Sequence, residues 1–139
     1  MTLPLNLSPA VKLAKSTATR SVLDADILPG KLLLFAAPRV AEGATPAAAA
    51  LVEVSLTNPS GSVDGTGFAI TASAPGQVTT SGTIAWGRFV DGAGNWVIDA
   101  DAGIAAVSPA VSPPIILDTA TVYAGGFVTL VSALLAEGG

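Results

Sequence analysis

The sequence predicts a mainly β fold, an antiparallel β-sandwich or barrel of about seven or eight strands preceded by a short N-terminal helix. Short apolar or alternating segments recur along the chain, clusters of Gly, Pro, Asn and Asp separate them, and only the N-terminal segment carries a helical period. The length of 139 residues suits one domain with a buried core. We therefore expect an N-terminal arm over residues 1–28 and one β domain over residues 29–139.

The N-terminal helix has a start signal, a periodic face and a stop signal. Ser8 is a good N-cap residue, and Pro9 suits the first helical position. Leu28-Pro29-Gly30 forces a turn. The pattern predicts a helix over residues 9–23. Its thin apolar stripe, spaced by three and four residues, consists of Val11, Ala14, Ala18 and Val22.

Three segments then read as strands. Residues 31–36 form an apolar run between prolines, residues 51–56 alternate, and residues 68–72 place Phe68 and Ile70 on one face. Residues 41–50, rich in alanine, are expected to be a loop, and Asn58-Pro59-Ser60-Gly61 predicts a turn.

The clearest pair of predicted strands forms a hairpin. Residues 80–90 and 95–100 flank a glycine-rich loop at 91–95, where glycine permits positive φ. An irregular connection around Pro109 and Pro113-Pro114 follows, and residues 127–134 predict the last strand.

The composition excludes several kinds of chemistry. The chain has no His and no Cys, which removes imidazole bases, thiol nucleophiles, Cys/His zinc sites, iron–sulfur clusters and disulfides. Gly92-Ala93-Gly94 and Gly65-Thr66-Gly67 are hairpin loops in this interpretation, because neither opens a helix after a parallel strand. The closely spaced carboxylates of Asp91, Asp99 and Asp101 lack the glycine and glutamate of a calcium loop, so we expect them to be solvated. We expect no catalytic residue, cofactor site or metal site, and no enzymatic activity.

Charge divides the chain into a basic arm and an acidic body. Residues 1–40 carry a net charge of +3 and residues 41–139 a net charge of −7. The arm with Lys12, Lys15 and Arg20 is either a solvated face or a surface that docks on acidic groups of a partner. In the second case, deletion of residues 1–25 should weaken assembly and leave the fold intact. The acidic total predicts no nucleic-acid binding, and no apolar run is long enough for a membrane span.

Three hairpin residues are further candidates for contacts with other molecules. We expect one or both of Trp86 and Trp96 to fill the core, with an exposed aromatic platform for a sugar or a protein as the alternative. Arg88 is the only basic residue after Arg39, and we expect it to form an ion pair within the sheet or across a subunit boundary.

The order of the strand and hairpin motifs over most of residues 28–133 resembles a family of small virion structural proteins of tailed bacteriophages and prophages. The motifs that carry the resemblance are Lys31-Leu32-Leu33-Leu34-Phe35, then Ala85-Trp86-Gly87-Arg88-Phe89-Val90-Asp91-Gly92-Ala93-Gly94, and then Tyr123-Ala124-Gly125-Gly126-Phe127-Val128-Thr129-Leu130-Val131. The longer proline-rich connection around Pro113-Pro114 departs from the family pattern.

This resemblance implies a capsid decoration or cement protein that binds the outer head lattice as an oligomer. Its partners would be the major capsid protein or other virion proteins and copies of itself, and its location would be the virion, assembled in the host bacterial cytoplasm. A tail or head–tail connector subunit is the alternative in the same class, and a host-glycan adhesion module is the alternative in another class. The candidate contact residues are Lys12, Lys15, Arg20, Trp86, Arg88 and Trp96.

Overall fold

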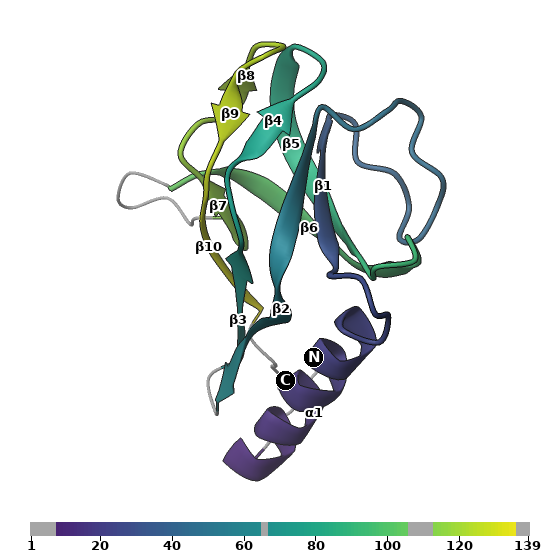
Figure 1. The fold of residues 1–139 in the computed structure, drawn as a ribbon, viewed down its shortest axis with the longest axis vertical. Coiled ribbons are helices and arrows are strands. Elements are labelled where there is room, and N and C mark those ends of the chain that lie inside the picture. The colour runs from purple at the N-terminus through teal and green to yellow at the C-terminus, as the bar shows by residue number, and fades with distance from the viewer. Residues whose placement is uncertain (1–7, 65–66, 106–112, 136–139) are drawn as a thin grey trace, which may run out of the picture.

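The computed structural model describes residues 8–64, 67–105 and 113–135. These residues form one helix and ten strands (Figure 1). The elements are α1 (Pro9–Leu23), β1 (Lys31–Ala36), β2 (Val52–Asp64), β3 (Gly67–Ala72), β4 (Gly76–Val78), β5 (Gly82–Val90), β6 (Trp96–Ile104), β7 (Ile115–Leu117), β8 (Thr121–Val122), β9 (Phe127–Val128) and β10 (Leu130–Leu135).

Seven of the strands in the described residues close into a barrel. Their order is β1-β5-β6-β7-β10-β3-β2, and β2 pairs with β1 to complete the ring. The short strands β4, β8 and β9 extend the sheet at the end of the barrel opposite α1 (Figure 1). The mainly β class is therefore confirmed, and of the two expected architectures the barrel is the one observed.

Two features of the sheet differ from the expected one. The pairing of β6 with β7 is parallel, whereas the other ladders in the described residues are antiparallel. The expected turn at residues 58–61 lies inside β2, where the register with β3 shifts between Leu56 and Gly61. The turn prediction was wrong because the register shift accommodates the extra residues as an irregularity in a continuing strand.

Interior positions are set by alternation along each strand. Leu32 and Leu34 of β1 lie opposite Phe89 and Gly87 of β5, and all four are buried. A Cβ at position 87 would come within about 3 Å of the side chains of Leu32, Leu34 and Ile115. Glycine at this position therefore allows these three side chains to pack against the backbone of β5. The core cluster extends through Phe68, Ile70, Ala100, Ala102, Ile115 and Leu117.

The helix confirms the predicted bounds and packs beside the barrel. The Ser8 hydroxyl accepts a hydrogen bond from the Val11 amide at 3.3 Å, which caps the first turn. Leu23, in the last turn, is fully buried and belongs to the barrel core. The helix lies mainly against β2 and β3. Figure 1 shows it running beneath the end of the barrel that these strands reach.

The other element predictions have mixed outcomes. The hairpin of β5 and β6 and the strand at residues 31–36 are confirmed, and the expected last strand is divided into β9 and β10 at Thr129. The short strands β4, β7 and β8 were not predicted. Residues 106–112, which include Pro109 of the expected irregular connection, lie outside the described residues, as do residues 65–66 of one glycine motif.

Candidate functional site

The outer face of β1, β5 and β6 carries a second packed layer outside the barrel core. Phe35 and Trp86, which are neighbours across the β1–β5 ladder, stack with ring centroids 4.5 Å apart. Trp86 is 1% exposed, and its indole N–H donates a hydrogen bond to the Ala36 carbonyl at 3.1 Å. The expected burial of Trp86 is confirmed, although it lies in this outer layer and not inside the barrel.

Next to this stack, Arg88 forms a buried ion pair. Its guanidinium donates to both carboxylate oxygens of Asp99 at 2.7 and 3.0 Å, and it lies 5.5 Å from the centre of the Trp86 ring. The side chains of Arg88 and Asp99 are only 8% and 1% exposed. The expected ion pair within the sheet is therefore confirmed, and the expectation that Asp99 is solvated was wrong.

The loop over residues 37–50 covers this outer layer. Arg39 donates to the carboxylate of Asp101 at 3.0 Å and to the carbonyl of Asp99 at 3.2 Å. The Gly43 amide donates to Asp99 at 3.0 Å, and a Cβ at position 43 would stand 3.0 Å from the ring of Trp96. Because Gly43 also has a φ of 72°, glycine is the residue that permits this contact.

Asp99 thus receives hydrogen bonds from both the strand and the loop. Burial alone would raise the pKa of Asp99, but the hydrogen bonds from Arg88 and from the Gly43 amide outweigh it and hold the pKa below its ordinary value. The carboxylate is therefore the charged centre that fastens the loop to the barrel.

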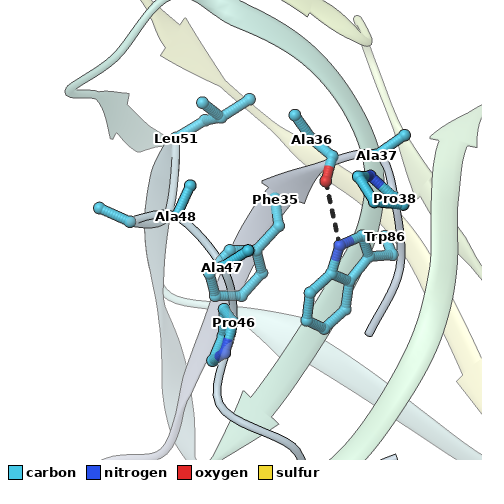
Figure 2. A pocket seen from close by; sticks show the side chains of 10 residues that line it. Phe35, Ala36, Ala37, Pro38, Pro46, Ala47, Ala48, Leu51 and Trp86 are labelled. Atoms are coloured by element: carbon cyan, nitrogen blue, oxygen red, sulfur yellow. Dashed lines mark hydrogen bonds between the residues drawn. The ribbon is translucent and has the colours of Figure 1, made fainter. Parts of the chain in front are cut away.

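A cavity of about 180 Å³ lies between the loop and the aromatic stack (Figure 2). Its walls are the rings of Phe35 and Trp86 on one side and the small side chains of Pro46, Ala47 and Ala48 on the other. The Trp86 N–H, the polar side-chain group among these lining residues, is already bonded to Ala36. The cavity therefore offers apolar contact and no acid–base group.

The hairpin loop at residues 91–95 is organised by Asp91. Its carboxylate accepts hydrogen bonds from the amides of Ala93 and Asn95 at 3.0 and 2.9 Å. The Asn95 amide is the main cause of the lowered pKa of Asp91. The expectation of a solvated carboxylate was wrong here too, because the carboxylate closes its own loop.

Trp96 and the helix cations are the exposed members of the predicted contact set. Trp96 is 47% exposed, and one face of its ring lies over Gly43. None of the ion pairs found in the described residues involves Lys12 or Lys15. The Arg20 guanidinium donates to the Gly61 carbonyl at 3.3 Å, so this cation contacts the barrel.

The six candidate residues therefore fall into separate places. Trp86 and Arg88 lie together beneath the loop, Trp96 lies beside the loop, and the three cations lie on α1. The burial of Trp86 and Arg88 leaves almost no surface for a partner. The contact prediction now depends on Lys12, Lys15, Arg20 and Trp96.

Sequence reasoning missed Phe35, Arg39 and Gly43 as parts of this layer. One signal was present, since a connection as long as residues 37–50 is uncommon in a compact domain and often has a function of its own.

Two other surfaces have exposed apolar side chains. Tyr123 and Phe127 border a cavity of about 150 Å³ between β8 and β9. On α1 and the turn that follows it, the exposed large apolar side chains are Val11, Val22, Ile27 and Leu28, with Leu13 on another side of the helix. Both surfaces consist of side chains suited to contact with another protein.

Comparison with protein-family models, curated proteins and solved structures finds no match to this chain. In the described part of the chain, no group of three or more acidic side chains is arranged to hold a metal ion. No helix within the same residues is long and apolar enough to cross a membrane.

Proposed function

We propose that this chain is an assembly protein that acts by binding other proteins, including its own copies. The observation that carries the proposal is the outward-facing apolar side of α1, where Val11 and Val22 are 43% and 53% exposed beside the exposed cation of Lys15. Exposed apolar surface next to polar groups is typical of protein interaction sites.

The outer layer of the barrel supports this proposal in a second way. Its charged groups bind one another, since Arg88 is paired with Asp99 and Arg39 with Asp101. The cavity beside them is lined by apolar side chains. These features are more typical of a rigid scaffold that presents binding surfaces than of a site that transforms a substrate.

The specific setting that we propose is the virion, as a decoration or cement protein on the outer head lattice. This setting depends on the resemblance of the strand and hairpin motifs at residues 31–35, 85–94 and 123–131. A small barrel with few charges suits such a role, because it can pack closely on a lattice and bury surface that the monomer leaves apolar. A tail or connector subunit would use the same surfaces in a different copy number.

The adhesion alternative loses one of its two candidate rings. A glycan platform needs an exposed aromatic ring, and Trp86 is buried against Phe35 and bonded through its N–H. Trp96 is 47% exposed and has one ring face over Gly43, so this alternative now depends on the other face of that ring.

Peptide mass spectrometry of virus particles purified from cells that carry the gene tests the virion setting. We expect the chain in the particles, at a copy number similar to that of the major capsid protein for a decoration protein. A copy number of about six or twelve would instead indicate a connector, as expected for a ring of cyclic symmetry. Particles that lack the chain, while the same cells contain it, would contradict the proposal.

A further inference from the structure

The helix α1 faces the barrel with its polar side. At about 100° per residue, Lys12, Ser16, Arg20 and Leu23 share one side of the helix, and each of them is partly or fully buried. The apolar stripe lies on the opposite side. Its members, all exposed, are Val11, Ala14, Ala18 and Val22. A surface helix normally buries its apolar stripe against the core, so this orientation is inverted.

Specific contacts hold the helix in this orientation. Leu23 enters the barrel core, Arg20 donates to the Gly61 carbonyl at 3.3 Å, and the Asp24 carboxylate accepts from the Ser60 amide at 3.0 and 3.1 Å. Rotating the stripe inward would break both polar contacts and remove Leu23 from the core. The stripe is therefore held outward by the fold.

The inner contact is not optimised for apolar burial. Ser16 and Ser60 are fully buried at the junction, and neither hydroxyl has a hydrogen-bond partner in the described structure. An unpaired buried hydroxyl is unfavourable. An alanine in place of Ser16 would suit folding better, whereas Val11, Ala14, Ala18 and Val22 of the stripe stay exposed in the described structure.

The outward apolar surface continues beyond the helix. Ile27 is 92% exposed and Leu28 is also exposed, in a turn where the Leu28 amide donates to the Asp26 carboxylate at 2.9 Å. Gly92 packs against the backbone of Leu28, so this turn is supported from the barrel side. Both side chains extend the apolar surface past Val22.

We propose that the stripe binds the same stripe of a second copy, with the two α1 helices antiparallel about a two-fold axis that passes between Ala14 and Ala18. The stripe is nearly symmetric about that point. Val11 of each copy would lie opposite Val22 of the other, and Ala14 opposite Ala18, as an isologous contact requires. The alanines at both central positions let the helix backbones approach closely, and antiparallel helix dipoles attract each other.

The residues beside the stripe distinguish this partner from two others. Lys15 is exposed next to the stripe, and residues 9–23 contain no acid, so two copies bring like charges together. Self-association should therefore persist or strengthen as salt is added, because salt screens the repulsion. An acidic protein or an anionic membrane would instead be bound more weakly at high salt. A membrane is also a poor fit for the stripe, because interfacial helices carry larger side chains than valine and alanine along the helix itself, and Ile27 and Leu28 lie beyond its end.

This inference deepens the proposed function, since it names the surface through which copies meet. A single helix pair makes a small interface, and small interfaces are transient. Sedimentation equilibrium of the full chain from about 10 μM to 1 mM is therefore the suitable measurement. We expect a monomer–dimer equilibrium that is as strong or stronger at high salt.

Two matched variants locate the interface. Ala18→Lys places a long side chain in the centre of the stripe, and we expect it to weaken dimerisation by about tenfold or more. Leu13→Lys adds the same charge at an exposed position away from the stripe and should weaken it less than about threefold. Equal weakening by both variants, or a monomer at every concentration, would overturn the inference.

Cysteine cross-linking tests the antiparallel register, because the natural chain has no cysteine. A mixture of Ala14→Cys and Ala18→Cys chains, with a mild oxidant, should form mixed disulfide dimers faster than either variant alone. Leu13→Cys is the control, because its cross-linking rate measures random collisions between chains. Faster cross-linking of each variant with itself would contradict the register. A monomeric chain that is still present in virus particles would refute this inference and leave standing the proposal that the chain binds other virion proteins.

Discussion

The guanidinium of Arg88 meets the carboxylate of Asp99 through two hydrogen bonds of 2.7 and 3.0 Å on the outer face of the barrel. The Gly43 amide donates to the same carboxylate at 3.0 Å. One acidic side chain therefore joins the β5–β6 hairpin to the loop over residues 37–50, and its removal should affect both.

Asp99→Ala should destabilise the protein by about 3–5 kcal/mol, because it leaves the Arg88 charge buried without a partner. The double variant Arg88→Met/Asp99→Leu removes both charges and should recover much of that loss. Urea denaturation followed by circular dichroism measures both variants. The interpretation would be contradicted if Asp99→Ala changed the free energy of unfolding no more than Asp101→Ala, whose carboxylate is exposed.

Acid should destabilise the fold through the same carboxylate. The pKa of Asp99 is lower in the folded chain than its ordinary value, so its contribution to stability is present above the unfolded-state pKa of about 3.9. That contribution is lost as the pH falls from about 4 through the lower pKa of the folded state. The urea midpoint, measured from about pH 2 to pH 7, should fall more steeply in the natural protein than in Asp99→Asn. Parallel curves would show that Asp99 does not carry this dependence.

Leu23→Ala should destabilise the protein by about 2–5 kcal/mol, because Leu23 is fully buried in the barrel core. The adjacent Val22→Ala is a matched control: Val22 is exposed, so the change should stay within about 0.5 kcal/mol for the monomer. Thermal or urea unfolding at low concentration measures both. The position of Leu23 also changes the expectation for deletion of residues 1–25, which should now destabilise the fold. Equal effects of the two substitutions would contradict this role for Leu23.

The two tryptophans should respond differently to iodide. Trp86 is 1% exposed and Trp96 is 47% exposed. The fluorescence of Trp96→Phe, which reports Trp86 alone, should be nearly insensitive to iodide, whereas that of Trp86→Phe should be quenched. Strong quenching in Trp96→Phe would mean that the loop does not cover Trp86 in solution.

Gly61→Ala should destabilise the protein strongly, because the added Cβ would overlap the Ala69 carbonyl oxygen on β3. Ser62→Ala, at the next and exposed position of β2, should change the free energy of unfolding by less than about 0.5 kcal/mol. Urea denaturation compares the two. A tolerated Gly61→Ala would argue against the close β2–β3 approach at the register shift.

Local signals in the sequence were sufficient for several elements. The N-cap at Ser8 marks the start of α1, the expected end at residue 23 is observed with Asp24 as the C-cap, and the glycine-rich loop at 91–95 locates the β5–β6 hairpin. The sequence pattern did not predict the short strands, which are defined by their pairing with neighbouring strands. The strands β4, β7 and β8 have two or three residues each, too few for a period to be visible.

The candidate site was predictable only in part. Arg88 was expected to form an ion pair, but its partner could not be chosen among several acids without the β5–β6 register that places Asp99 opposite it. Trp86 was expected to be buried, but nothing in the sequence shows that the loop over residues 37–50 folds back on the outer face.

The sequence by itself determined the bounds of the helix and the places of β1, β3 and the β5–β6 hairpin, because capping groups, prolines and alternating side chains act over a few neighbouring residues. Only the tertiary structure decided that seven strands of the described chain close into a barrel, and that α1 turns its apolar stripe away from it. The orientation of the helix depends on contacts such as Asp24 with Ser60 and Arg20 with Gly61, which join residues far apart in the chain. A helical period shows that one face is apolar, but it cannot show which face the rest of the molecule will cover.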